Sequence, residues 1–190
     1  LLLKTVATLA KEGDTGTLLR RELVRTARGY KMTVDSTLMA DEIAKEVGLD
    51  ADTKVVDTPC VRYWAKEEQN APELDAVGYA TFRRSMGRLL YEALARPDLQ
   101  YAAKDGARHL QCPVVTDWWR VRRMVRYLRA YPIVELRFEL TSWPPCLRAT
   151  VDADWAGEPQ TRRSTSAGII ELGDAALTSW SRTQGCTALS

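Results

Sequence analysis

Two kinds of hydrophobic pattern follow one another along the chain. Between Leu18 and Asp35, apolar and polar residues alternate on both sides of an Ala-Arg-Gly sequence, which predicts a β-hairpin. From Ser36 to residue 130, apolar residues recur at spacings of three and four, the period of amphipathic helices. Alternation returns after residue 132 and predicts further strands. The pattern therefore predicts an α/β (α+β) fold with a hairpin, then helices, then a strand-rich part.

The helical stretch divides into four predicted helices. Ser36 is the expected N-cap of the first helix, and Gly48 lies where that helix should stop. Pro97 should end the second helix, because the residue before a proline is pushed out of helical geometry. A third helix is expected over residues 97–111, and Thr116 is the expected N-cap of the fourth. Residues 50–78 contain two prolines, many charges and no sustained period, and they predict an exposed connection.

The fourth predicted helix carries arginine on the side opposite its apolar arc. Its arginines are Arg120, Arg122, Arg123, Arg126 and Arg129. They fit a solvated helix face, and they also fit contact with nucleic-acid phosphates, which guanidinium groups bind in a bidentate manner. Arg162 and Arg163 allow the same two interpretations, as loop charges or as contacts along a nucleic-acid backbone.

Asp152 and Asp154 are two carboxylates one residue apart in a predicted strand. Residues at this spacing share one face of a strand, with backbone positions about 6.7 Å apart. Their repulsion is about 2.5 kcal/mol at an effective dielectric constant of 20. An exposed pair tolerates this, and a solvated strand end is one interpretation. A partly buried pair needs protonation or a cation, and hard carboxylate oxygens suit Mg²⁺ or Mn²⁺.

Composition narrows the classes of protein to which the chain can belong. The 27 Lys and Arg residues nearly balance the 25 Asp and Glu residues, so the formal charge is +2 and does not by itself indicate a nucleic-acid partner. Four cysteines without a CxxC pair and a single histidine argue against a zinc site and favour a reduced intracellular protein, in the cytoplasm or nucleus. The apolar N-terminal run is too short to span a bilayer, so no membrane partner is expected. The first residue is not methionine, which indicates a piece of a longer chain.

Three stretches, in order, resemble the Pol polyproteins of Ty1/copia-type retrotransposons. "GYKMTVDSTLMADEIAKEVGLDADTKVVDTP" is similar to a hairpin, helix and V-x-T-P segment of their reverse transcriptase. "FRRSMGRLLYEALARPDLQYA" and "HLQCPVVTDWWRVRRMVRYLRAYP" resemble the end of that enzyme, with its T-R-P-D-I element and W-x-x-x-x-R-x-x-R-Y-L helix. "VDADWAGEPQTRRSTSAGIIELGDAALTSWSRTQGCTALS" resembles the start of the ribonuclease H domain, with its S-D-A-D-W-A-G and R-R-S-T-S-G motifs.

The resemblance implies two parts, the C-terminal part of a reverse transcriptase over residues 1–143 and the first strands of a ribonuclease H-like mixed sheet, incomplete, over residues 144–190. Complete relatives would be RNA-directed DNA polymerases that also cleave the RNA of RNA–DNA hybrids with two Mg²⁺ or Mn²⁺ ions. By motif position, Asp152 is the catalytic ligand on a central strand, and Asp154 is a second, supporting acid. The implied partners are an RNA–DNA hybrid or template–primer and the remainder of the polyprotein.

The resemblance also implies that neither active site is complete here. The family's next carboxylate follows an A-L-S motif that stands at the last three residues, and its polymerase aspartates would lie upstream of Leu1. We therefore expect the chain alone to be inactive and to bind no metal tightly. A non-catalytic nucleic-acid-binding or interaction module is the alternative. Arg84, Arg88, Ala167 and Cys186 depart from the family pattern and indicate a diverged copy.

Overall fold

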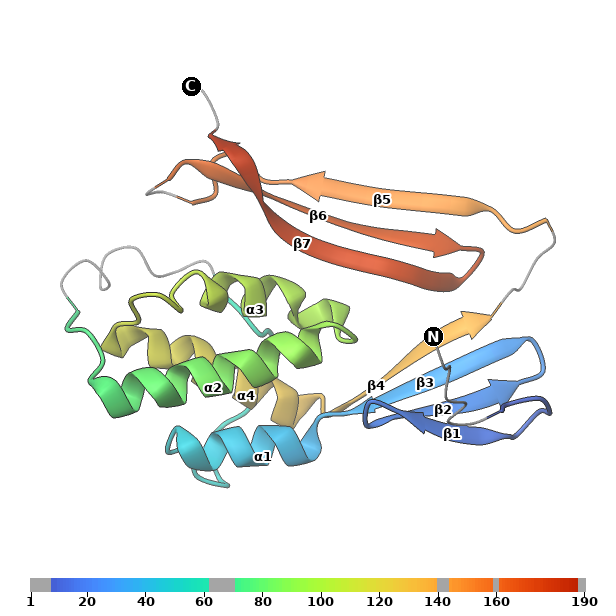
Figure 1. The fold of residues 1–190 in the computed structure, drawn as a ribbon, viewed down its shortest axis with the longest axis horizontal. Helices are drawn as coiled ribbons and strands as arrows, with labels where there is room; N and C mark the ends of the chain where they lie inside the picture. The colour runs from blue at the N-terminus through green and yellow to red at the C-terminus, as the bar shows by residue number, and fades with distance from the viewer. Residues whose placement is uncertain (1–7, 62–70, 140–143, 159–160, 188–190) are drawn as a thin grey trace, which may run out of the picture.

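The computed structural model describes residues 8–61, 71–139, 144–158 and 161–187. It contains helices and two antiparallel sheets, so the predicted mixed α/β composition is confirmed. In Figure 1 the helices form one half of the lower layer and a four-stranded sheet forms the other, while a three-stranded sheet lies above both. Residue 144, where the sequence places the boundary between the two parts, directly precedes the three-stranded sheet.

The four-stranded sheet joins segments from opposite sides of the helical stretch. Its strands are β1 (Thr15–Leu18), β2 (Arg21–Thr26), β3 (Gly29–Asp35) and β4 (Ile133–Glu139), in the order β1-β2-β3-β4. The predicted hairpin is confirmed as β2 and β3, which pair antiparallel. The later strand β4 pairs with β3 from Gly29↔Glu139 to Asp35↔Ile133. All four helices therefore lie, in sequence, between two paired strands.

The predicted helices are confirmed with small changes at their ends. They are α1 (Thr37–Glu46), α2 (Ala76–Ala93), α3 (Gln100–Ala107), which follows the 3-10 turn η2 (Pro97–Leu99), and α4 (Trp118–Ala130). Their apolar faces form one core, in which Phe82, Met86, Leu89 and Leu128 are among the fully buried side chains. Phe82 meets Trp118 edge to face, with ring centroids 5.6 Å apart. Burial of these faces, rather than the propensity of short helices, stabilises the helical part.

Two predicted helix caps need correction. Ser36 occupies the N-cap position of α1, but its hydroxyl donates to the carboxylate of Glu92 instead of capping the helix. The side chain that caps the start of α1 is that of Asp35, whose Oδ1 accepts from the Thr37 amide at 2.9 Å. Thr116 is not the N-cap of α4, since a 3-10 turn, η3 (Val115–Asp117), precedes that helix. Buried Asp117 satisfies this turn by accepting from the Val114 amide at 2.8 Å.

A buried arginine joins three connections of the fold. Arg96, directly after α2, has no exposed side-chain surface. It donates to both carboxylate oxygens of Asp98, with the shortest distance at 2.7 Å, and to the Tyr131 carbonyl at 2.9 Å. It also donates to the Ser36 hydroxyl at 3.3 Å. Arg96 therefore links the starts of α1 and η2 to the turn between α4 and β4.

The three-stranded sheet contains the predicted strands in their predicted chain order. It comprises β5 (Leu147–Ala153), β6 (Arg163–Leu172) and β7 (Ala175–Thr187), all antiparallel, in the order β5-β6-β7. Residues 151–153 are pleated, as expected, but β5 is an edge strand among the described residues and not the central strand that the resemblance implied. Strand order depends on pairing between distant segments, which local alternation does not encode. β7 packs against α3 and β4, so it connects this sheet to the rest of the fold (Figure 1).

Within the described part of the chain, none of the helices has both the length and the apolar character needed to cross a lipid bilayer.

Candidate functional site

The two predicted site carboxylates lie at the C-terminal end of β5 and directly after it. Asp152 pairs with Ala167 of β6, which pairs with Ser181 of β7, so these three share one sheet face. Asp154 follows the strand and sits opposite Thr165. Side chains on the same face contact α3, since Gln100 Nε2 donates to Ser179 Oγ at 3.0 Å. The prediction that Asp152 and Asp154 share a face agrees with this placement.

Asp152 borders an open groove between the sheet and the start of α3. The groove has a volume of about 300 Å³, and its wall includes Pro97 and Tyr101 from the helical side and Ile169 from the sheet. Asp152 itself is exposed. Burial raises the pKa of the Tyr101 hydroxyl, and the negative charge of Asp105 raises it further. Tyr101 therefore supplies a neutral hydrogen-bonding group to the wall of the same groove at physiological pH.

Asp154 belongs to a different environment, in which its carboxylate organises the turn between β5 and β6. Its Oδ1 accepts from the Thr165 amide at 2.6 Å, and its own amide donates to the Thr165 carbonyl at 3.1 Å. Lys104 Nζ contacts Thr165 Oγ1 at 2.5 Å. Burial lowers the pKa of Lys104, and the neighbouring Arg108 lowers it further. Asp154 therefore lies close to the charged group of Lys104 on α3 and is partly buried.

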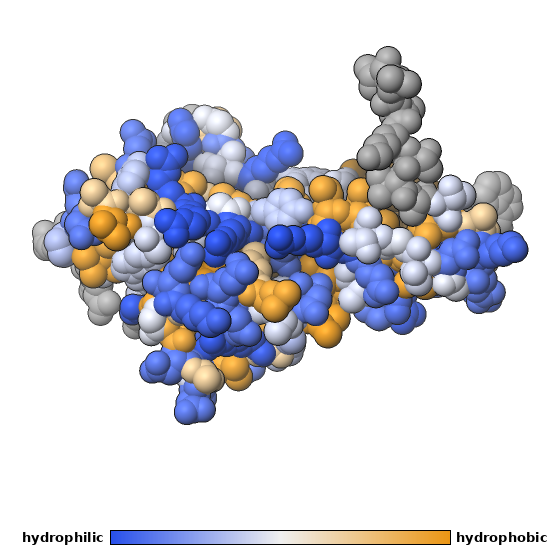
Figure 2. Space-filling model, turned by 60° about the horizontal axis from the view of Figure 1, so that its bottom comes forward, coloured by the Kyte–Doolittle hydropathy of each residue, from blue (hydrophilic) through white to orange (hydrophobic). Residues whose placement is uncertain are grey.

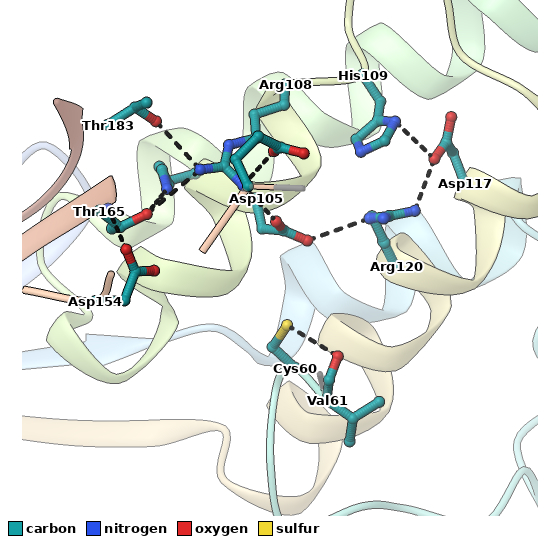
Figure 3. Close-up of polar contacts among 12 residues, drawn as sticks. Cys60, Val61, Asp105, Arg108, His109, Asp117, Arg120, Asp154, Thr165 and Thr183 are labelled. Carbon is teal, nitrogen blue, oxygen red and sulfur yellow. Dashed lines mark hydrogen bonds and ion pairs between the residues drawn. The ribbon is translucent and has the colours of Figure 1, made fainter. Parts of the chain in front are cut away.

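Arg108 connects α3 to this turn and to the last strand (Figure 3). Its guanidinium lies 2.7 Å from a carboxylate oxygen of Glu158 and 3.3 Å from one of Asp105. It also donates to Thr165 Oγ1 at 3.3 Å and Thr183 Oγ1 at 3.4 Å. These contacts hold the three-stranded sheet against the helical part largely by polar groups, and they fix the groove beside Asp152.

The described residues do not fit a complete divalent-metal site. No group of three or more His, Cys, Asp and Glu side chains within them could hold a metal ion. Of the two predicted ligands, Asp154 already accepts a backbone hydrogen bond and lies beside Lys104, whose charge opposes a second cation. Asp152 supplies one open carboxylate, whereas Mg²⁺ takes six oxygen ligands and usually keeps several waters.

The predicted arginine arc of α4 separates into a buried member and four outer members. Arg120 was expected on the polar side of the helix, but it is only 7% exposed. It donates to Asp117 Oδ1 at 2.8 Å and to Asp105 Oδ2 at 3.2 Å, and His109 Nδ1 lies 3.1 Å from the same Asp117 oxygen (Figure 3). Pairing with two acids allows a buried guanidinium, which a hydrophobic pattern cannot anticipate. The Asp117–Arg120 spacing of three residues was the one available signal.

The four outer arginines hold the chain segment that follows α1. We call them the arginine ladder, and we call residues 47–58 the strap. The contacts are Arg122 Nε to the Val47 carbonyl at 3.0 Å, Arg123 Nη2 to Thr58 Oγ1 at 2.7 Å, Arg126 Nε to the Lys54 carbonyl at 2.5 Å, and Arg129 Nη1 to the Asp50 carbonyl at 2.8 Å. The outer face of α4 is therefore partly covered, because the ladder donates hydrogen bonds to three carbonyls and a hydroxyl of the strap.

The face of the molecule that carries α1 is strongly polar. Figure 2 turns the lower side of Figure 1, which carries α1, toward the viewer, and hydrophilic side chains gather there over the helical part. Arg122 remains exposed at the surface. Contact between the ladder and nucleic acid stays a prediction.

Arg162 and Arg163 lie elsewhere, at the turn between β5 and β6. Both are exposed, and Arg162 has a positive φ of 51°. The Arg162 amide donates to the Glu158 carbonyl at 2.8 Å, which closes this turn. The structure therefore places these two arginines near Asp154 in sequence and fold, and in a different part of the chain from the arginine ladder.

Fold and site together define a mixed α/β segment in which a helical part contacts a small antiparallel sheet whose first strand carries Asp152. Over 100 residues the chain is 35% identical to the retrovirus-related Pol polyprotein from transposon RE2 of Arabidopsis thaliana, a match that covers 53% of this chain and 7% of that protein. The match to the retrovirus-related Pol polyprotein from transposon TNT 1-94 of Nicotiana tabacum is 25% identical over 183 residues and covers 94% and 14%. The match to secreted RxLR effector protein 161 of Plasmopara viticola is 30% identical over 122 residues and covers 64% and 80%.

No protein-family model matches the chain, and no solved structure does. The two polyprotein matches confirm the resemblance of the chain to Pol polyproteins of Ty1/copia-type retrotransposons. The chain spans 7% and 14% of the lengths of the two polyproteins named above.

Proposed function

We propose that this chain is the segment of a retrotransposon Pol polyprotein that joins the end of the reverse transcriptase, residues 1–143, to the start of the ribonuclease H domain, residues 144–190. In the whole polyprotein it would serve RNA-directed DNA synthesis and cleavage of RNA in RNA–DNA hybrids. The observation that carries the proposal is the position of Asp152 on the first strand of an antiparallel sheet that follows the helices and β4 along the chain.

In this proposal the two acids have different roles. Asp152, exposed beside the groove, is one of several carboxylates that would hold Mg²⁺ or Mn²⁺, and the metal would activate water for hydrolysis. Asp154 supports the site by ordering the β5–β6 turn through the Thr165 amide. Among the described residues no group of three or more His, Cys, Asp and Glu side chains could hold a metal ion, so we propose that the chain alone neither cleaves hybrids nor binds magnesium tightly.

Two assays test this assignment. The purified chain, incubated with a labelled RNA–DNA hybrid and magnesium, should give no cleavage, and cleavage that disappears in Asp152→Asn would overturn the proposed inactivity. A chimera then tests the role of the segment. The chain replaces the aligned segment of an active Ty1/copia-type Pol polyprotein, and Asp152→Asn should abolish ribonuclease H cleavage while DNA synthesis continues. Thr150→Val, which alters the same strand without removing a carboxylate, should retain cleavage.

The second candidate is a non-catalytic module that binds nucleic acid through the arginine ladder. It is favoured by the clustering of four guanidinium groups along one helix, each with several donors, and by the exposure of Arg122. Hybrid binding by the chain should then weaken as salt rises, because phosphate contacts release counterions. Charge reversal of Arg122, Arg123 and Arg126 should remove that binding, and equal binding by the reversed variant would exclude this candidate.

A further inference from the structure

The strap is anchored at its ends and only lightly packed between them. Leu49 and Cys60 are partly buried against the helical core near the two ends. Between them most residues are exposed, including Asp50, Asp52 and Asp57. Loop segments with few buried apolar contacts open at low free-energy cost. The middle of the strap is therefore held chiefly by hydrogen bonds from the arginine ladder.

The acceptors that the strap offers to the ladder are weaker than the ligands arginine binds best. Three are neutral backbone carbonyls and one is the Thr58 hydroxyl. Hydrogen bonds from guanidinium to a charged oxygen are roughly twice as strong as neutral ones, and phosphate accepts two at once. Among the described contacts, no salt bridge joins the exposed acids of the strap to the ladder, and the one carboxylate paired with the ladder is Asp41 of α1, 3.5 Å from Arg129 Nε. A phosphate backbone is therefore able to displace the strap and to accept the hydrogen bonds that the ladder now donates to the strap.

We propose that residues 47–58 form a displaceable strap that occupies the arginine ladder, and that a polyanion such as an RNA–DNA hybrid binds the ladder by releasing the strap. This rests on the second candidate function above, and it adds a gate to that surface. In this gate, the polyanion and the strap compete for the ladder, so the ladder cannot bind both at once. Binding should therefore expose the strap to solvent, whereas a ligand that simply coats the surface should cover it.

Trypsin cleavage after Lys54 reports on the strap directly. Lys54 is exposed and its carbonyl accepts from Arg126, so cleavage there requires that segment to detach. Cleavage tracks the population of the open state when opening is fast. Addition of a hybrid oligonucleotide, without metal, should accelerate cleavage after Lys54 by at least about threefold through mass action on the open state. Cleavage at exposed Arg28, in the β2–β3 turn, gives the internal reference for any effect on trypsin itself.

Two variants separate the gate from the ligand. Leu49→Asn/Thr58→Ala loosens one anchor and removes the acceptor of Arg123 while all four ladder arginines remain. It should be cleaved faster without hybrid and should bind hybrid more tightly by fluorescence anisotropy. Asp50→Asn/Asp52→Asn should also bind more tightly than Glu12→Gln/Glu22→Gln, which changes the net charge equally at two exposed positions outside the strap, one before β1 and one on β2.

The outcomes are distinguishable. Faster cleavage after Lys54 with hybrid, together with tighter binding by the loosened variant, supports the gate. Hybrid binding that leaves cleavage after Lys54 unchanged or slower overturns the gate and leaves the nucleic-acid-binding candidate standing. Absence of hybrid binding by both the natural chain and the loosened variant overturns that candidate and the gate with it.

Discussion

Replacement of Arg96 by methionine is expected to destabilise the chain by about 3 kcal/mol, near the lower end of the range for breaking a buried ion pair. The side chain has no exposed surface and donates six hydrogen bonds, of 2.7 to 3.4 Å, to Asp98, Ser36 and the carbonyls of Tyr131 and Pro132. Methionine fills much of the space but donates nothing. The loss is moderated because Asp98 remains 30% exposed and keeps a 2.8 Å bond from Tyr127.

Urea unfolding followed by circular dichroism measures this change. With a slope of about 2 kcal/mol per molar urea, a loss of about 3 kcal/mol lowers the midpoint by about 1.5 M. Arg96→Lys keeps the positive charge but loses the planar guanidinium that binds several acceptors at once. Its urea midpoint should therefore fall between those of the natural chain and Arg96→Met. Arg84→Met is the matched control, because the Arg84 side chain is 54% exposed and its loss should cost less than about 0.5 kcal/mol. The reasoning would be refuted if the unfolding free energy of Arg96→Met, obtained from its midpoint with the same slope, lay within about 0.5 kcal/mol of that of the natural chain.

The same variant predicts a dependence on pH. Burial alone would raise the pKa of Asp98, but its contacts with Arg96 and Tyr127 outweigh burial, and the pKa is lowered. A lowered pKa in the folded state stabilises the fold above the ordinary value of about 3.9, and this stabilisation is lost as the pH falls through the lowered value. The difference in unfolding free energy between the natural chain and Arg96→Met should therefore be constant above about pH 5 and shrink below about pH 4. A difference that persists unchanged to low pH would exclude this contribution of Asp98.

Three further changes test other parts of the fold. Gly29→Ala should cost about 1–3 kcal/mol, since its new Cβ would lie 2.1 Å from the Phe138 carbonyl oxygen and force β3 from β4; Gly185→Ala, with open space around it, is the control in the same unfolding experiment. Gly87→Ala, within α2 and unobstructed, should instead stabilise the fold by about 0.5–1 kcal/mol, and a lower melting temperature would contradict this. Arg108→Gln should increase amide hydrogen exchange in β6 and β7 more than in α2, because it removes the contact with Glu158; equal exchange in both would show that the sheet is held in other ways.

The local pattern of apolar and polar residues predicted the helices and strands, but it did not predict which strands pair with one another. The alternation around residues 18–35 and the three-and-four spacing from Ser36 to residue 130 predicted the hairpin and the helices, because both reflect burial of one face. The pairing of β3 with β4 and the edge position of β5 depend on segments far apart in sequence, and periodicity carries no such information. β1 was not separated from the hairpin, since four residues are too few to show a period.

The candidate site divides in the same way. The spacing of Asp152 and Asp154 predicted a shared face, and the resemblance ranked Asp152 first, but neither indicated that Asp154 would face Lys104. The arginines of α4 were visible as a group. Their separation into buried Arg120 and a ladder against the strap depended on acids and carbonyls supplied by other elements. Buried polar groups of this kind find their hydrogen-bond partners on other elements of the fold, so the sequence of one segment does not predict them.

The pairing of β3 with β4 also has a consequence for how the chain is made. Roughly a hundred residues separate the end of β3 at Asp35 from the start of β4 at Ile133. At translation rates of about 5–20 residues per second, the outer edge of β3 waits about 5–20 seconds on the ribosome for its partner. During that interval its unpaired amides and carbonyls invite pairing with any other nascent strand. Slow or paused synthesis across the helices should thus raise the aggregated fraction of newly made protein.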